Sequence, residues 1–284
     1  MTDFVLEPAA CGYAATLHGL DLAQPLDEAT LVRLRAAWRD YPVLCFAGQD
    51  LDPARLQAFG AQLGPFGDDP YVAALPGFPH VIEVRREARE TAPIFGSQWH
   101  SDWSFQATPP SATLLYGAEV PPLGGDTLFA NGYAACAGLS ADFRAWLKTR
   151  HGVHSAAPSY GPQGLFARDD ATRSMRIIVS ADAERSERHP VIRRHAESGR
   201  ETLYVNHVYT VGIEGLRQDE SRAILDYLFA HFTRPEYQYR HRWQPGSLLM
   251  WDNRCVIHLA TGGYEGHRRL MYRSTLAGER PLPA

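Results

Sequence analysis

Short strand-like runs separated by turns recur along this chain of 284 residues, and they restrict the folds open to it. Apolar or alternating runs lie at 13–22, 42–46, 80–85, 113–120, 126–130, 175–179, 190–195, 201–206, 237–242, 247–250, 255–259 and 269–276. Helical spacing of apolar residues occurs at 27–39, 53–63, 140–150 and 219–232. Many short strands with a few covering helices favour a sandwich or jelly-roll core. We therefore predict a mainly β fold with flanking helices (α+β), built on a jelly roll.

The length of the chain suits one β-rich domain, so we expect residues 1–284 to form a single unit. Strand signals weaken near 68–98, which is rich in Pro and Gly, and near 160–188, which is rich in Arg and Asp. Long connections of this kind often cover binding sites. We expect both segments to act as mobile lids.

Charge and composition exclude several classes of partner. The formal net charge of −4 gives no reason to expect nucleic acid, and no apolar run is long enough to cross a bilayer. The N-terminal residues lack a basic stretch followed by an apolar one, so we expect no secretory leader. Four cysteines, at 11, 45, 136 and 255, show no C-x-x-C spacing. They indicate reduced thiols and a cytoplasmic protein.

A His-x-Asp triplet at His100 and Asp102 is answered far downstream by His258. In an extended strand, residues two apart face the same side, so His100 and Asp102 could reach one metal ion together. Two imidazoles and one carboxylate suit a non-haem Fe(II) that keeps open positions for a co-substrate and O2. Because the chain has twelve histidines, the triplet alone is a weak signal. Its surroundings strengthen it.

Two arginines follow His258 on the last long strand-like run. Alternation places Arg269, Met271 and Arg273 on one face if the strand begins by Arg269. Buried guanidinium groups are costly unless anions pair with them, and their planar forks match carboxylates. Either these arginines bind two anionic ligands, or they form a solvated basic strand edge together with Arg268. Their position just after a candidate metal ligand favours the ligand site.

The motifs, taken in order, resemble those of the TauD/TfdA family of Fe(II)- and 2-oxoglutarate-dependent dioxygenases. The resemblance covers nearly the whole chain. It is carried by WHSDWSF at 99–105, PPLGGDTLF at 121–129, HPV at 189–191, LYVN at 203–206, WDNR at 251–254 before His258, and RLMYR at 269–273.

This resemblance implies roles for six residues. His100, Asp102 and His258 match the iron ligands of the family. Arg269 and Thr127 match the groups that bind the distal carboxylate of 2-oxoglutarate. Arg273 matches an arginine that often holds an anionic group of the primary substrate.

The resemblance also implies a fold, a reaction and an assembly. The fold would be the cupin-like double-stranded β-helix. The reaction would consume O2 and 2-oxoglutarate, hydroxylate the substrate, and release succinate and CO2. Family members commonly form homodimers or tetramers, so we expect a homo-oligomer.

The substrate is expected to differ from taurine. Taurine-specific members carry a His-Pro-x-Tyr segment and an Asn before the metal motif, where this chain has Asp69 and Gly96. Arg273 still indicates an anionic group. We expect a small organic anion, such as a sulfonate, a sulfate ester or a carboxylate of the phenoxy-acid type, that is larger and more aromatic than taurine.

Two other classes of function remain open at this level. The chain could be a non-catalytic metal-binding jelly roll, although a sensor would not need the co-substrate anchor that Arg269 and Thr127 imply. It could also be a zinc hydrolase, which would need neither O2 nor 2-oxoglutarate.

Other residues near the motifs are left with two readings. Asp252 and Asn253 could orient His258 or simply form a tight turn. Core packing is favoured over pocket lining for Trp99, Trp103 and Phe105. His207 is left out of the metal set.

Overall fold

The structure is a computed structural model and describes residues 4–168 and 171–284. Its α-helices are α1 Glu28–Asp40, α2 Pro53–Leu63, α3 Gly132–Ala137, α4 Ala141–Leu147, α5 Ala157–Tyr160 and α6 Gln218–Phe232. The strands of the first half are β1 Val5–Pro8, β2 Ala14–His18, β3 Val43–Phe46, β4 Ile82–Arg86, β5 Ala112–Glu119, β6 Thr127–Asn131 and β7 His151–Ser155. Those of the second half are β8 Ser186–Pro190, β9 Ile192–Arg194, β10 Glu201–Leu203, β11 Thr210–Ile213, β12 Gln238–His241, β13 Leu248–Asp252, β14 Val256–Ala260, β15 Arg269–Leu276 and β16 Leu282–Pro283.

A large sheet with the order β1-β2-β3-β13-β5-β15-β4 forms one layer of the fold. Its central strand β13 shows why this layer is buried on both faces. Leu248 and Met250 pack into the cluster that contains the apolar residues of α1 and α2. Leu249 and Trp251 alternate with them and join a second cluster on the opposite face. The near-continuous apolar run at 247–250 therefore fits a strand covered on both sides.

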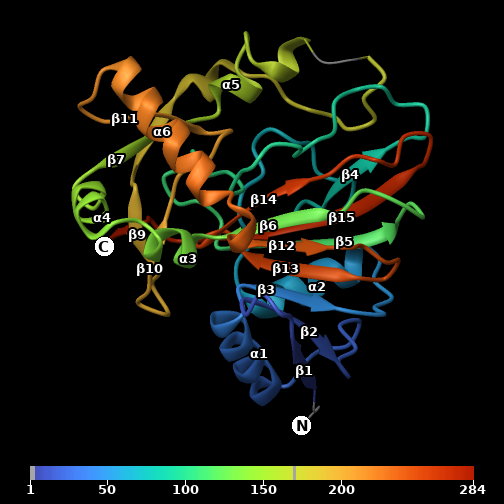
Figure 1. Ribbon diagram of the computed structural model, residues 1–284. Coiled ribbons are helices and arrows are strands. Elements are labelled where there is room, and N and C mark those ends of the chain that lie inside the picture. The colour runs from blue at the N-terminus through green and yellow to red at the C-terminus, as the bar shows by residue number, and fades with distance from the viewer. Residues whose placement is uncertain (1–3, 169–170) are drawn as a thin grey trace.

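The second layer is the small sheet β12-β6-β14, which packs on the large sheet. Phe129 of β6 and Val256 of β14 share a cluster with Leu249 and Trp251 of β13. Ile257 points the other way, into the cluster that contains the apolar face of α6. Figure 1 shows α1 and α2 beside the blue strands of the large sheet and α6 on the side of the small one. The two layers with helices outside them form the predicted mainly β sandwich.

Two further three-stranded sheets have the orders β11-β7-β8 and β10-β9-β16. The runs predicted at 190–195 and 201–206 contain β9 and β10, which pair antiparallel as a hairpin. Two of the predicted helices begin at side-chain caps: Asp27 accepts a hydrogen bond from the Thr30 amide, and Ser140 accepts one from the Phe143 amide.

One predicted strand is wrong. Residues 175–179 form no strand and make only an isolated bridge, between Val72 and Ile177. Met175 and Ile177 pack into an apolar cluster, whereas Ile178 and Val179 remain 39% exposed despite their β propensity.

The two segments expected to be lids differ in regular structure. The segment at 68–98 contains β4, and the one at 160–188 contains two 3-10 helices, Leu165–Arg168 and Ala181–Glu184, and the start of β8. Residues 169–170 of the second segment lie outside the described residues. The expectation that the segments 68–98 and 160–188 act as mobile lids stays a prediction. In the described part of the chain, none of the helices has the length and apolar character needed to traverse a membrane.

Candidate metal and co-substrate site

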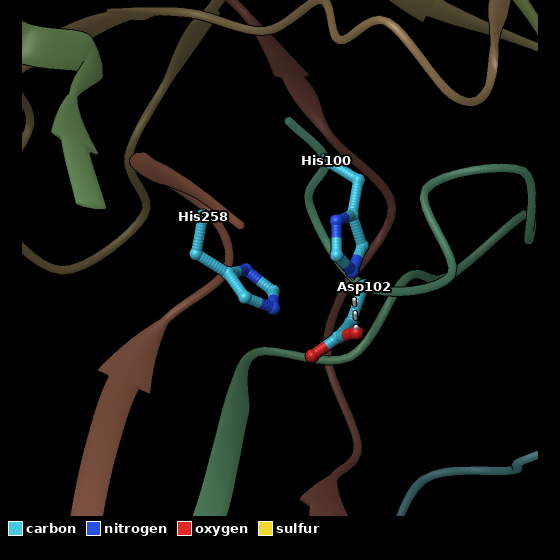
Figure 2. Close-up of side chains that lie close together, drawn as sticks. All are labelled: His100, Asp102 and His258. Carbon is cyan, nitrogen blue, oxygen red and sulfur yellow. Dashed lines mark ion pairs between the residues drawn. The ribbon is translucent and has the colours of Figure 1, made fainter. Parts of the chain in front are cut away.

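Strand β14 places His258 between the two main sheets. Its neighbour Ile257 packs toward α6, so His258 points inward by strand alternation. His100 meets it through an isolated antiparallel bridge, in which each backbone N–H donates to the other residue's carbonyl over 2.9 and 2.8 Å. Backbone hydrogen bonds thus join two candidate ligands that lie 158 positions apart in the sequence. Figure 2 shows their side chains.

Asp102 reaches the same point by a route that differs from the expected strand. After the bridge at His100 the chain turns, and Trp103 adopts a φ of 47°. The three side chains nevertheless converge, with ligand atoms of His100, Asp102 and His258 all within 4.8 Å of one another. His100 Nε2 lies 3.6 Å from Asp102 Oδ1 (Figure 2). The predicted ligand set is therefore brought together, although the local structure is a turn.

The protonation of these side chains fits a metal ion. His100 Nδ1 lies 2.7 Å from the Gln98 carbonyl, which leaves Nε2 with a free lone pair. Burial, followed by the adjacent His100, lowers the pKa of His258 to about 3, so its imidazole is neutral. Burial alone would raise the pKa of Asp102, but Arg273 and the two histidines hold it well below its usual range. One carboxylate and two imidazoles are the donor set of the facial triad typical of non-haem Fe(II).

A hydrogen-bond chain orients the Asp102 carboxylate. Thr113 Oγ1 donates to Asp102 Oδ2 over 2.6 Å, which leaves Oδ1 on the side of His100. Asn253 Nδ2 donates in turn to Thr113 Oγ1 over 2.9 Å. Asn253, for which only a role in the turn before His258 was considered, therefore contacts the candidate ligand Asp102 through Thr113. The sequence offers no signal for Thr113, because only the pairing of β5 with β13 brings it here.

A small cavity adjoins the triad, and we call it the inner cavity. It has a volume of about 40 Å³, and its lining includes His100, His258, Thr127, Arg269 and Arg273. The three predicted anion-binding residues are thus grouped around one space beside the candidate metal ligands. The alternation predicted for Arg269 and Arg273 is confirmed, since both side chains are buried and face this cavity.

Arg269 and Thr127 each have a hydrogen-bond donor that is available to a ligand. Arg269 is 4% exposed, its Nε has no hydrogen-bond partner, and burial lowers its pKa. Among residues 4–168 and 171–284, no carboxylate pairs with it. Thr127 Oγ1 accepts a hydrogen bond from Trp243 Nε1 over 2.9 Å, so the hydroxyl proton remains available. An anion in the inner cavity would satisfy both groups.

Arg273 is held by two carboxylates. Its Nη2 lies 2.7 Å from Asp69 Oδ1, and its Nη1 lies 3.4 Å from Asp102 Oδ1. Trp103 Nε1 also donates to Asp69, over 2.5 Å. Burial would lower the pKa of Arg273, but Asp102 and Asp69 raise it. The sequence identified Asp69 only as a departure from the taurine pattern, and its pairing with Arg273 was not expected.

A larger cavity, the outer cavity, opens beside the inner one. It has a volume of about 180 Å³, and both cavities share Phe95, Gly96, His100 and Arg273 in their walls. Trp103, for which core packing was favoured, is buried and also lines this space. Trp99 and Phe105 pack against apolar clusters, and His207 is exposed and stacks on Phe229.

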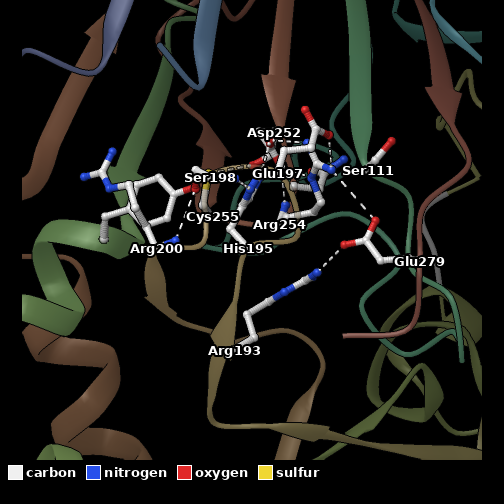
Figure 3. A network of polar contacts seen from close by, with 12 residues as sticks. Ser111, Arg193, His195, Glu197, Ser198, Arg200, Asp252, Arg254, Cys255 and Glu279 are labelled. Carbon is white, nitrogen blue, oxygen red and sulfur yellow. Dashed lines mark hydrogen bonds and ion pairs between the residues drawn. The ribbon is translucent and has the colours of Figure 1, made fainter. Parts of the chain in front are cut away.

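A second group of possible metal ligands, formed by His195, Asp252 and Cys255, lies at the turn that joins β13 to β14 (Figure 3). Its polar atoms are already used. Arg254 donates to both oxygens of Asp252, and His195 Nε2 lies 2.9 Å from Oδ2. The Ser198 amide donates to His195 Nδ1, and burial raises the pKa of the Cys255 thiol. This cluster therefore stabilises the turn before β14, and Asp252 acts there as a structural residue.

A jelly roll that combines a facial triad with an adjoining anion-binding cavity has the architecture of a metal-dependent oxygenase. A family model described as "Taurine catabolism dioxygenase TauD, TfdA family" matches residues 6–275. The chain belongs to this family. The family predicted from the motifs is thus confirmed, together with the jelly-roll fold class and the enzyme class, a dioxygenase.

Individual relatives match over most of their length. An alpha-ketoglutarate-dependent 2,4-dichlorophenoxyacetate dioxygenase of Cupriavidus pinatubonensis is 32% identical, covering 93% of this chain and 94% of the relative. An alkylsulfatase of Acinetobacter baylyi is 30% identical over 93% of this chain and 82% of its own. A taurine dioxygenase from Burkholderia xenovorans, known from a crystal structure, has 31% sequence identity to this chain. The two structures superpose with a TM-score of 0.82, covering 99% of this chain and 93% of the other.

Proposed function

We propose that the protein is an Fe(II)- and 2-oxoglutarate-dependent dioxygenase that hydroxylates a small organic anion and releases succinate and CO2. The observation that carries this proposal is the inner cavity, where the buried Arg269, whose Nε has no hydrogen-bond partner among the described residues, and the Thr127 hydroxyl adjoin His100 and His258. A dicarboxylate is the ligand chemistry that would satisfy a guanidinium at one end of the cavity and a metal at the other.

In this proposal His100, Asp102 and His258 hold the metal, and Arg269 and Thr127 hold the distal carboxylate of 2-oxoglutarate. When bound, Fe(II) supplies the coupling of O2 reduction to decarboxylation of 2-oxoglutarate and to oxygen insertion into a C–H bond. The chain keeps Asp102 ionised, orients it through Thr113, and excludes water with apolar walls.

The substrate class rests on relatives and on the outer cavity. Relatives of this chain are named for alkyl sulfates, sulfate esters and phenoxy acids. The outer cavity is lined by Phe95, Trp103, Tyr160, Phe166 and Tyr209, and it contains Arg273. A cavity of about 150 Å³ is large enough for a benzene ring. The volume of about 180 Å³ therefore suits a substrate that is bulkier and more aromatic than taurine.

The decisive experiment measures cofactor binding and turnover separately. Under nitrogen, Fe(II) and 2-oxoglutarate together should produce a weak visible charge-transfer band that neither produces alone. In air, a panel of aryl carboxylates, alkyl sulfates and sulfonates should release succinate only when 2-oxoglutarate and O2 are present. Substrate cleavage in the absence of both 2-oxoglutarate and O2 would support the zinc hydrolase. A charge-transfer band without any turnover would support the non-catalytic metal-binding protein.

Location and assembly remain proposals. Four free cysteines agree with a cytoplasmic, reducing environment. We also expect a homodimer or homotetramer, and light scattering of the purified protein would measure it.

A further inference from the structure

Thr127 and Arg269, the two groups proposed to hold the distal carboxylate, share one neighbour, the indole of Trp243. This tryptophan follows β12, whose last residue, His241, pairs with Thr127 of β6. The Trp243 side chain is buried, and it lies outside the lining of the inner cavity. Any effect that it has on a ligand in the cavity must therefore pass through the residues that it contacts.

The first contact of the indole restricts the direction of the Thr127 hydroxyl. Trp243 Nε1 lies 2.9 Å from Thr127 Oγ1, and an indole nitrogen can only donate a hydrogen bond. Thr127 Oγ1 therefore accepts this bond, and its own proton needs a different acceptor. In the part of the chain that the structure describes, no acceptor takes it. Because Thr127 lines the inner cavity, this proton is available to a ligand there.

The second contact of the indole is with the Arg269 guanidinium. The central carbon of the guanidinium lies 6.0 Å from the centre of the Trp243 ring and 5.8 Å from that of the Tyr264 ring. A cation beside an aromatic ring is attracted to it, and the attraction is stronger where water is excluded. Arg269 is buried, so both rings stabilise its charge and limit its movement.

Main chain closes another side of Arg269. Gly125, in the PPLGGDTLF motif, has a φ of 69°, and a Cβ there would stand 3.4 Å from Arg269 Nε and 3.3 Å from Tyr264 Cδ1. Arg269 Nη2 lies 3.4 Å from the Gly125 carbonyl oxygen. The guanidinium is thus confined by aromatic rings and backbone, and the space left for an anion beside it is the inner cavity.

We propose that Trp243 is a positioning residue for the co-substrate. Its N–H aligns the Thr127 hydroxyl and its ring packs beside Arg269, so that both donors are in place before the distal carboxylate of 2-oxoglutarate binds. Preorganised donors bind more tightly because less conformational freedom is lost on binding. This inference rests on the proposed function, and it assigns a role to a residue for which the sequence motifs indicated none.

Calorimetric titration of 2-oxoglutarate into the protein loaded with Fe(II) under nitrogen tests this inference. The variant W243F keeps an aromatic ring beside Arg269 and removes the N–H. Its dissociation constant for 2-oxoglutarate should rise about 3- to 10-fold, the range expected for one hydrogen bond. W243L removes the ring as well and should raise the dissociation constant further. The affinity for Fe(II), titrated in the same variants, should remain that of the wild type.

A double-mutant cycle measures whether Trp243 acts through Thr127. T127V removes the hydroxyl to which the indole donates. In this background, W243F should change the dissociation constant for 2-oxoglutarate by less than about twofold, because residues that share a hydrogen bond have non-additive effects. A residue that only supports the fold would instead have the same effect with and without the Thr127 hydroxyl.

The matched control is W38F. Trp38 of α1 is also buried, and its Nε1 has no hydrogen-bond partner among the described residues, so W38F should bind 2-oxoglutarate like the wild type. Unchanged binding in W243F would overturn the proposal. So would additive effects of W243F and T127V, an equal loss in W38F, or a parallel loss of Fe(II) affinity in W243F. A wild type that binds no 2-oxoglutarate would refute the proposed function and this inference with it, whereas normal binding in both the wild type and W243F refutes only the role of Trp243.

Discussion

Gly96 lies directly against the imidazole of His100: a Cβ at this glycine would stand 3.4 Å from His100 Cε1. Its φ of 76° is in the left-handed region, and its carbonyl accepts a hydrogen bond from the amide of Ala260, the last residue of β14. The wall shared by the two cavities is therefore built around a residue without a side chain. The glycine that distinguishes this chain from the pattern expected of taurine-specific members therefore lies at van der Waals distance from a candidate metal ligand.

The variant G96A should consequently disturb the metal centre as well as the fold. A left-handed alanine costs about 1–2 kcal/mol, and the new methyl group would lie in van der Waals contact with His100, 3.4 Å from Cε1. The control G77A has a φ of 84° and no atom within 4 Å of its Cβ, so it carries the same backbone cost without the contact. Both variants should unfold at lower denaturant concentrations, and only G96A should also lose metal affinity. Equal metal affinity in the two variants would show that His100 tolerates the methyl group.

Removing the Thr113 hydroxyl should weaken metal binding without removing a ligand. T113V would abolish the hydrogen bond to Asp102 Oδ2 and leave Asn253 Nδ2 without its acceptor. Loss of a partner that orients a metal ligand typically lowers affinity by about 10- to 100-fold. Titration with Fe(II) or Mn(II) measures this loss, and T113S should restore most of the affinity. The buried Thr202 of β10 gives the control T202V, and a similar loss in that variant would point to a general effect on stability.

Replacing Arg269 should affect the co-substrate and leave the metal in place. R269Q removes the unpaired buried guanidinium from the inner cavity, and a hydrogen bond to a charged group is worth about 1.5–3 kcal/mol. The dissociation constant for 2-oxoglutarate should therefore rise by about 10- to 100-fold, while the affinity for Fe(II) stays the same. Its neighbour Arg268 is paired with Glu87 and Glu119 and provides the control R268Q. If both variants bound 2-oxoglutarate equally well, the anchor would lie elsewhere.

The strands that carry His258, Arg269 and Arg273 could be predicted because their apolar alternation is local. The partners of these residues could not be predicted in the same way. Asp69 and Thr113 come from a loop and from a neighbouring strand, and only tertiary pairing brings them to Arg273 and Asp102. The motif singled out Asp102 as a candidate ligand, and its side chain does lie beside His100 and His258, but strand geometry was the wrong reason, because the chain turns at that point.

Stability should fall with decreasing pH because histidines are buried in the neutral form. Burial lowers the pKa of His241 to about 4, and its Nε2 has no hydrogen-bond partner. Between pH 6.5 and 4 the unfolded chain binds a proton at this residue that the folded chain does not bind, so folding is progressively penalised as pH falls through this window. Each such histidine lowers the free energy of unfolding by up to about 1.4 kcal/mol for each pH unit below its unfolded pKa. The variant H241F should unfold with a shallower pH dependence across this range, measured by urea denaturation at several pH values. A pH dependence equal to that of the wild type would mean that His241 is already protonated in the folded protein.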